Sequence, residues 1–386
     1  MSKRLVTALA SVGVLLVLVA AVLMTRSGDT TGADPSGTTP PGPSADAGPP
    51  PAELRTYTAE EAGRAFLDGY VQDDGRVVRT DQGGDTVSEG QAYAMLVAVA
   101  LGDAETFDAV WAWTQDNLRR ADGLLSWRWD GRVIDPSSAS DADLDAARAL
   151  VLAGESFGEP GYTTAGVDLG RALLDLETVQ TAAGRILTAG QWAMTEPYAY
   201  NPSYASPGAT AALAAASGDP RWAELDAGSR AVTAALLREA PLPPDWAQVH
   251  ADGTVEAMPG AQGRGQSVRY GYDAARTPIR MAESCDPADR ALAAAMVDAL
   301  DRGGDAAELD LGGSPLGEGG SVVAAVAQAA AVAASGDTER AVEELVDGDR
   351  LAQLSPSYYG AAWAALGRLV LTDDVLGECP PAPLAP

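Results

Sequence analysis

Apolar residues recur along most of the chain at the spacing of one helical face. Met95, Leu96, Val99 and Ala100 show this spacing within one such segment. Each segment ends in a loop rich in Gly, Pro or Asp, and alternation typical of strands is confined to possible hairpins at 76–79 and 249–257. The pattern therefore predicts an all-α domain, a toroid of paired helices. The expected helices are 59–71, 88–101, 103–118, 141–156, 165–176, 206–216, 220–238, 273–283, 287–301, 320–334, 338–346 and 356–371.

Several of these segments begin with residues that favour a helix start. Ser88, Ser140 and Ser206 are residues of the N-cap type, whose hydroxyl can accept a hydrogen bond from a free N–H of the first turn. Pro220 and Pro287 suit a first turn, where the missing N–H costs nothing. We expect helices to begin at or next to these positions.

The N-terminal segment differs from the rest. Lys3 and Arg4 precede an apolar run from Leu5 to Met24, and twenty helical residues rise about 30 Å, enough to cross a bilayer. Residues 1–26 are therefore predicted to be a membrane anchor, with a cleaved signal sequence as the alternative. Residues 27–52 have the composition of a disordered linker, so the globular domain spans 53–386 and is expected outside the cell membrane.

Rare residue types exclude several kinds of chemistry. The 386 residues carry a net charge of -28 and contain one lysine, Lys3, and one histidine, His250. A P-loop, an interior Schiff-base lysine and a zinc site with several histidines are thus excluded, and the charge argues against nucleic acid as a partner. Asp141, Asp143 and Asp145 lack the glycine and distal Glu of an EF-hand calcium loop. No cofactor or metal is expected, and any catalysis should use carboxyl groups.

Amphipathic aromatic residues are concentrated in the loops. The sequence has eight Trp and eleven Tyr but three Phe, and many of them lie beside acidic residues. Aromatic faces pack against sugar rings and carboxylates accept hydrogen bonds from sugar hydroxyls, so the set predicts a groove for a neutral glycan. For a single residue, the alternative is that its ring fills space beneath a loop. The set includes Trp127, Trp129, Trp192, Tyr198, Tyr200, Tyr204, Trp246, Tyr270, Tyr272, Tyr358 and Tyr359.

Four short segments, in order along the chain, resemble the characteristic blocks of glycoside hydrolase family 8. They are VSEGQAYAML at 87–96, ASDADLDAA at 139–147, NPSY at 201–204 and GYDAAR at 271–276. Weaker similarities lie at 244–246 and 358–360, so the resemblance extends over most of 57–371 and is greatest to the branch associated with cellulose synthase. The chain departs from the family pattern at Ala94, Ala146, Phe157 and 277–280, which leaves the substrate preference open.

The resemblance implies an (α/α)6 barrel of about twelve helices and an inverting endo-glycanase. Glu89 would then be the general acid, Asp273 the general base and Asp141 the carboxylate of the central subsite. The resemblance also places substrate-binding residues around them: Tyr204, Arg276, Trp127, Trp192, Tyr272, Tyr358 and Tyr359.

Two carboxyl groups with opposite protonation are what an inverting glycosidase needs. A helix N-terminus lowers the pKa of a carboxyl, whereas burial beside a second carboxylate raises it. We therefore hypothesise that Asp141 helps to keep Glu89 protonated. Without the resemblance, a Ser-Glu pair that opens a helix is more often a cap than a catalytic group.

The expected protein is an exported, membrane-anchored, monomeric endo-β-1,4-glucanase-like hydrolase. Xylan and chitosan remain possible substrates, and a glycan-binding or assembly protein that has lost hydrolysis is the alternative function. Cys285 and Cys379 would lie in an oxidising compartment, where a disulfide and two free thiols are both possible.

Overall fold

The computed structural model describes residues 54–265, 267–373 and 375–376. These residues contain thirteen α-helices, each of which is followed by a turn or loop. Their bounds are α1 Ala59–Tyr70, α2 Ser88–Ala100, α3 Ala104–Leu118, α4 Ser140–Ser156, α5 Pro160–Leu176, α6 Pro207–Ser217, α7 Arg221–Glu239, α8 Arg276–Ala282, α9 Pro287–Ala294, α10 Val297–Gly303, α11 Val322–Ser335, α12 Thr338–Leu354 and α13 Tyr358–Thr372.

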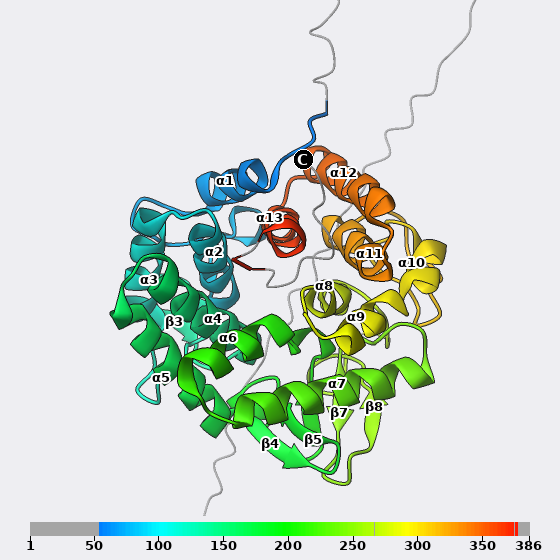
Figure 1. Cartoon of the computed structure of the whole chain (residues 1–386), viewed down its shortest axis with the longest axis horizontal. Helices are drawn as coiled ribbons and strands as arrows, with labels where there is room; N and C mark the ends of the chain where they lie inside the picture. Colours follow the sequence, from blue (N-terminus) through cyan, green and yellow to red (C-terminus); the bar gives the residue numbers. More distant parts are fainter. Residues whose placement is uncertain (1–53, 266, 374, 377–386) are drawn as a thin grey trace, which may run out of the picture. The chain divides into compact units, whose positions relative to one another are not determined.

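The helices form an inner and an outer ring, and the chain passes from one ring to the other with nearly every helix (Figure 1). The inner helices are α2, α4, α6, α8, α11 and α13. The sequence accounts for this position, because α2 and α11 are mostly apolar or small all round, and a helix of that kind is stable only when surrounded by protein. The expected toroid of helix pairs is present.

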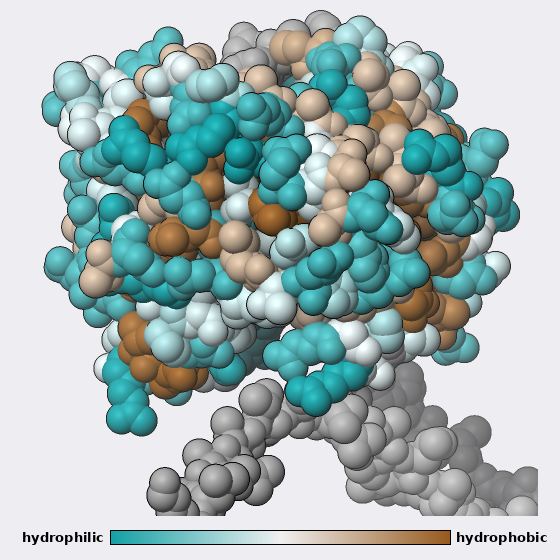
Figure 2. Space-filling view, turned by 90° about the horizontal axis from the view of Figure 1, so that it is seen from below, coloured by the Kyte–Doolittle hydropathy of each residue, from teal (hydrophilic) through white to brown (hydrophobic). Residues whose placement is uncertain are grey.

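The outer helices are amphipathic. In α1, the buried residues Ala62, Gly63, Phe66 and Leu67 recur at i, i+1, i+4 and i+5, which places them on one face. The helix begins with a capping box, in which the Thr58 side chain accepts from the N–H of Glu61 and the Glu61 carboxylate accepts from the N–H of Thr58. Figure 2 shows hydrophilic residues over much of one outer face, with hydrophobic residues in small separate groups.

Most expected helix bounds are confirmed within a few residues, with several corrections. The helix expected at 338–346 continues to Leu354, and the helix expected at 165–176 begins at Pro160. The helix expected at 287–301 is divided into α9 and α10. The helix expected from 273 begins at Arg276, so Asp273 lies in the preceding turn. Ser88 and Ser140 are first helical residues rather than N-caps, because the extended residues before them, Val87 and Ala139, precede the first turn. Ser206 is an N-cap, and its side chain accepts from the N–H of Ala209.

Short strands connect the helices at the end that carries the candidate site. β1 (Thr86–Val87), β2 (Arg128–Trp129) and β3 (Val133–Asp135) form one antiparallel sheet. β6 (Tyr198–Tyr200), β7 (Ala247–Val249) and β8 (Val255–Ala257) form another, and β4 (Thr178–Thr181) pairs with β5 (Gly184–Leu187). The hairpin expected at 249–257 is confirmed, whereas 76–79 forms only an isolated bridge between Val77 and Val71.

Three expectations concern residues outside the described ranges. The predicted anchor at 1–26, the linker at 27–52 and Cys379 all lie there. Within the described ranges, none of the helices has the length and apolarity needed to span a membrane. Cys285 is disulfide-bonded.

Candidate active site

Glu89 lies in the first turn of α2, close to the strand that precedes the helix. The N–H of Ser88 donates to the carbonyl of Trp127 at 2.9 Å, and β1 pairs with β2, so the start of α2 is fixed to the loop that carries Trp127. The Glu89 side chain is 24% exposed. The junction between β1 and α2 therefore places Glu89 at the start of the helix, where its carboxyl remains partly open to solvent.

Asp141 occupies the corresponding position in α4. The hydroxyl of Ser140 donates to the carbonyl of Thr188 at 2.5 Å, which holds the start of α4 against the loop after β5. The Asp141 side chain is 9% exposed. The carboxyl is therefore nearly enclosed, and only part of it can face a ligand.

Asp273 lies in the turn that leads into α8. The N–H groups of Gly271 and Ala274 both donate to Oδ1 of Asp245, at 2.8 and 2.9 Å. The hydroxyl of Tyr359 donates to the carbonyl of Tyr272 at 2.9 Å. The turn is thus held from two sides, while the Asp273 side chain stays 35% exposed.

Arg276 joins these three acids. Its Nη1 lies 2.9 Å from Oε1 of Glu89 and 3.0 Å from Oδ2 of Asp141, and its Nη2 lies 2.7 Å from Oδ1 of Asp273. The guanidinium is 2% exposed and its central carbon lies 5.4 Å from the ring centre of Tyr204. The structure thus places Arg276 and Tyr204 beside the acids, and one buried cation compensates three neighbouring carboxyl groups.

The environment of Glu89 favours its protonated form. The pKa of Glu89 is raised to about 7. Burial is the largest cause, Arg276 and a hydrogen bond from Tyr93 oppose it, and the charges of Asp141 and Asp273 add to it. Asp141 thus acts in the hypothesised direction, although burial is the larger cause. The hydroxyl of Tyr93 donates to Oε1 at 2.8 Å, the same oxygen that Arg276 binds, so Oε2 is left to carry the proton.

The pKa values of the other two acids are also raised. For Asp141, burial is the largest cause, Arg276 opposes it and Asp145 adds to it. For Asp273, burial is again first, Arg276 opposes it and the charge of Asp245 adds to it. Asp273 is the most exposed of the three and has a full hydrogen bond from Arg276, which makes it the acid best placed to ionise.

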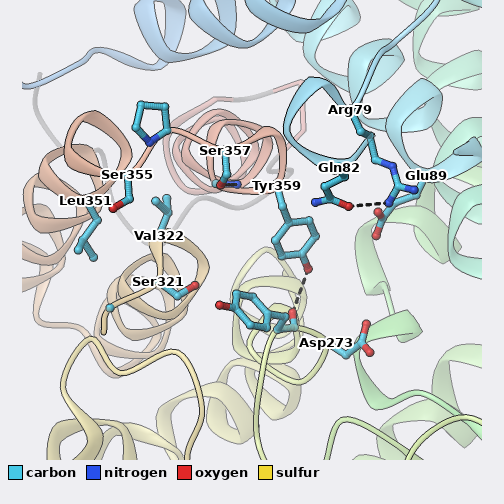
Figure 3. Close-up of a pocket in the computed structure, with 14 residues that line it drawn as sticks. Arg79, Gln82, Glu89, Asp273, Ser321, Val322, Leu351, Ser355, Ser357 and Tyr359 are labelled. Atoms are coloured by element: carbon cyan, nitrogen blue, oxygen red, sulfur yellow. Dashed lines mark hydrogen bonds between the residues drawn. The ribbon is translucent and has the colours of Figure 1, made fainter. Parts of the chain in front are cut away.

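A pocket of about 660 Å³ opens from Glu89 and Asp273 toward α11 and α13 (Figure 3). Tyr272 and Tyr359 line it, in edge-to-face contact with ring centres 6.2 Å apart. Hydroxyl groups and one guanidinium provide most of its other polar contacts. They come from Ser321, Ser355, Ser357 and Arg79.

Trp127 and Trp192 lie outside the lining of this pocket, on the side of the acids where α4 begins. Trp192 belongs to a 3-10 turn (Gln191–Ala193) and is 43% exposed. The N–H of Gln191 donates to the hydroxyl of Ser138, which lies shortly before Asp141 in the chain. This hydrogen bond holds the turn of Trp192 against the segment that leads into Asp141.

Tyr358 is a correction to the expected set. Its ring is 1% exposed and packs against Phe66 and Tyr70 in the core, with ring centres 6.2 and 5.7 Å away. It cannot be a sugar platform in this position. The first residue of α13 points inward because the apolar face of the helix begins there, and its neighbour Tyr359 reaches the pocket instead.

Comparison with known proteins agrees with this geometry. The family model described as Glycosyl hydrolases family 8 matches residues 56–367. The chain belongs to this family.

The similar relatives of the family 8 chain include a probable endoglucanase of Novacetimonas hansenii, 34% identical over 223 residues, which are 55% of this chain and 64% of the relative. An endoglucanase of Cellulomonas uda is 29% identical over 229 residues, 57% of this chain and 62% of the relative. The match thus spans less than two thirds of either relative.

Solved structures show the same fold. An endo-β-1,4-glucanase of family 8 from an Achatina fulica gut metagenomic library has a TM-score of 0.69 at 26% identity, over 83% of this chain and 98% of the other. The endo-β-1,4-glucanase of Acetobacter xylinum has a TM-score of 0.67 at 25% identity, over 81% and 97%.

Three polar residues of this family 8 site were not predicted from the sequence. Tyr93 is four residues after Glu89, one helical turn away, and that spacing is a signal that was available. Asn201 and Asp245 come from distant loops. The Nδ2 of Asn201 is buried without a hydrogen-bond partner and, together with Trp246, lies near enough to Asp273 to lower its pKa.

The three aspartates of α4 do not form a common metal site. Asp141 binds Arg276, Asp145 binds Arg280, and Oδ1 of Asp143 accepts from the N–H of Leu125 at 2.8 Å. Among the described residues, no group of three or more potential metal ligands is close enough to hold an ion.

Proposed function

We propose that this family 8 protein hydrolyses internal β-1,4 linkages of a neutral glucan with inversion of configuration. The observation that carries the proposal is that Glu89 and Asp273 bind the two ends of one buried guanidinium and both face the same pocket. Two carboxyl groups separated in this way can flank one glycosidic bond and a water, the arrangement of an inverting enzyme, in which they lie roughly 6.5–9.5 Å apart.

In the proposed reaction, Glu89 donates the proton on Oε2 to the glycosidic oxygen as the bond from that oxygen to the anomeric carbon breaks. Asp273 accepts a proton from a water, whose oxygen bonds to the anomeric carbon on the opposite face. Glu89 ends ionised and Asp273 protonated, and exchange with solvent restores both. A Glu89 pKa near 7 and an Asp273 held ionised by Arg276 give each group the protonation state that its role requires.

Asp141 and Tyr204 would act on the sugar at the point of cleavage. Asp141 shares Nη1 of Arg276 with Glu89, so its carboxylate lies beside the general acid and can stabilise the positive charge that develops on the sugar ring. Tyr204 packs edge-to-face on Trp246, with ring centres 6.1 Å apart, which fixes its hydroxyl near Asp273.

The charges in the pocket support a neutral substrate. Among the described residues that line it, the carboxyl groups are Glu89 and Asp273, and both bind Arg276. The remaining charged group is Arg79, whose guanidinium binds the buried carboxylate of Asp85. A glucosamine ammonium would find no free carboxylate there, so chitosan is a poor fit despite the acidity of the whole protein. The relatives named endoglucanases support a glucan over xylan.

We also propose that the domain acts outside the cell, attached to the membrane by residues 1–26. The apolar run from Leu5 to Met24 supports this location. So does the disulfide of Cys285, since such bonds persist in oxidising compartments.

The test is release of reducing sugar by the full chain from neutral mixed-linkage β-glucan, xylan and chitosan, with Glu89→Gln as the matched inactive variant. We expect activity on the β-glucan, less on xylan and none on chitosan, and a loss of roughly 100-fold or more in Glu89→Gln. Binding without hydrolysis in the unchanged protein would instead support a glycan-binding protein. Full activity in Glu89→Gln would refute the assignment of the general acid.

A further inference from the structure

On one side, the turn that carries Asp273 is held by the side chain of Asp245, from another part of the chain. Oδ1 of Asp245 accepts hydrogen bonds from the N–H groups of Gly271 and Ala274, on either side of Asp273, at 2.8 and 2.9 Å. Asp245 lies in the loop between α7 and β7, and its own N–H donates to the carbonyl of Arg269 at 2.8 Å. The two segments are therefore tied by both backbone and side chain.

The turn is shaped to receive this carboxylate. A Cβ added to Gly271 would lie 2.7 Å from Oδ2 of Asp245, closer than atoms of this kind approach. A glycine at 271 is thus what allows the Asp245 carboxylate to reach both N–H groups. The Asp245 side chain is 14% exposed, so these hydrogen bonds are largely shielded from water.

The carboxylate of Asp245 has one cationic neighbour. The Nε of Arg269 lies 3.3 Å from Oδ2 of Asp245, and Nη1 of Arg269 lies 2.9 Å from Glu308, so the cation is shared between two acids. Because Arg269 also binds Glu308, it compensates the charge of Asp245 only in part. The remaining negative charge of Asp245 acts on the Asp273 carboxyl. The pKa of Asp273 is raised by that charge, after the larger effects of burial and of the opposing Arg276.

We infer that Asp245 is a positioning residue for Asp273, which fixes the geometry of the turn with its two hydrogen bonds and strengthens Asp273 as a base through its charge. The inference rests on the proposed function, since it assigns Asp245 a purpose in that reaction. Asp245 does not line the pocket of Glu89 and Asp273, so it acts on Asp273 rather than on the substrate.

Several charged groups besides Asp245 surround the Asp273 carboxyl. Arg276 from α8 and Asp245 have been described, and Glu89 from α2 and Asp141 from α4 share the same guanidinium. The remaining groups around it are uncharged at neutral pH: Asn201, Tyr204, Trp246 and Tyr359. Changing Asp245 therefore alters one charge and leaves the others in place.

The test uses two variants of the full chain. Asp245→Asn keeps an oxygen that can accept both backbone N–H bonds and removes the charge. We expect the acid limb of the pH profile of kcat/KM to move down by roughly 0.5–1 pH unit, because a base with a lower pKa stays ionised to lower pH. Asp245→Ala removes the acceptor as well, so kcat should also fall by roughly 10- to 100-fold with little change in KM.

A second measurement does not depend on activity. The pKa of Asp273, followed by titration of carbon-13-labelled carboxyl groups, should fall in both variants, and the N–H groups of Gly271 and Ala274 should exchange faster only in Asp245→Ala. If the unchanged protein hydrolyses no glycan, the proposed function fails, and this titration still decides the inference.

Asp103→Asn is the matched control, since Asp103 also binds a backbone N–H and an arginine, but at the start of the outer helix α3. It should leave the acid limb and the Asp273 titration unchanged. An unchanged Asp273 titration in Asp245→Asn, or an unchanged kcat in a folded Asp245→Ala, would overturn the inference.

Discussion

Asp145 pairs with Arg280 one helical turn beyond the pair that Asp141 makes with Arg276. Both pairs join positions 135 residues apart, and a third pair with the same separation, Arg148 with Glu283, continues the series with the charges reversed. Three buried ion pairs at a constant offset mean that α4 and α8 run parallel in a fixed register. Arg276 belongs to the first pair of this series, so its place between the acids is supported by the two pairs that follow it along α4 and α8.

Breaking the third pair should destabilise the fold. In Arg148→Met, Glu283 would be left buried without its cation, which we expect to cost about 3–5 kcal/mol of unfolding free energy in a denaturant titration. The exposed pair Arg171 and Asp168 on α5 provides the control, because Arg171→Met should cost less than about 1 kcal/mol. If both variants lost the same unfolding free energy, the buried ion pairs would not be a special support of the fold.

Asp273→Asn should remove most of the hydrolysis and leave binding nearly unchanged. An amide cannot accept the proton from water, so kcat should fall by roughly 100- to 10,000-fold with KM within a few-fold of its original value. Added azide, a nucleophile that needs no base, should restore turnover and yield a glycosyl azide. The exposed Asp252→Asn is the control and should keep full activity. A variant Asp273→Asn that retains its kcat would exclude Asp273 as the base.

The stereochemistry of the product is a direct test of the proposed arrangement. Because water would attack from the face opposite the leaving group, the first product released from a β-glucan should carry a reducing end in the α configuration. Proton NMR during the first minutes, before mutarotation, separates the two anomers. A product that first appears as the β-anomer would require a covalent intermediate and would rule out Asp273 as the activator of water.

Stability should fall as pH rises through neutrality, because of a buried pair beneath the site. The Glu177 carboxyl is buried close to the hydroxyl of Ser138 and the N–H of Gln191, and Oδ2 of Asp143 is buried without a hydrogen-bond partner. Burial raises the pKa of Glu177 to about 7 and, with the charge of Glu177, raises the pKa of Asp143 well above its usual range.

The pKa of Glu177 is about 7 in the folded protein and near 4.3 in the unfolded chain. Protonated Glu177 therefore stabilises the fold fully below about pH 4.3, and this contribution is lost as the pH rises through about 7. Calorimetry from pH 5 to 8 should show Tm decreasing with pH. Glu177→Gln should flatten this dependence, because the amide does not titrate. Glu89 contributes a decrease of the same sign, so part of the slope should remain. A Tm that rises across this interval, or a slope that Glu177→Gln leaves unaltered, would contradict the expectation.

Trp192 should contribute to binding rather than to the fold. Its ring is 43% exposed beside the start of α4, so Trp192→Ala should leave Tm nearly unchanged and raise KM for a long glucan about 10-fold, or about 1.4 kcal/mol. Val346→Ala, at a residue of α12 that is 37% exposed, is the control and should change neither value. An unchanged KM in Trp192→Ala would place the sugar chain elsewhere.

Much of this protein could be predicted from local sequence. The period of apolar residues predicted the helices, and the mostly apolar or small composition of α2 and α11 on all sides assigns them to the inner ring. The short blocks around Glu89, Asp141, Asp273 and Arg276 identified the family that the match over 56–367 confirms. Local patterns are informative here because helix formation and capping depend on residues within a few positions of one another.

Tertiary structure alone decided how these residues act together. Tyr358 and Tyr359 are adjacent in sequence, yet one is in the core and the other lines the pocket, because the rotation of α13 against α1 and α2 sets the direction of each side chain. The contact of one guanidinium with three acids, the support of the Asp273 turn by Asp245 and the pKa of Glu89 all depend on burial and on distances between segments far apart in the chain. Those quantities arise from packing, and no local pattern of residues contains them.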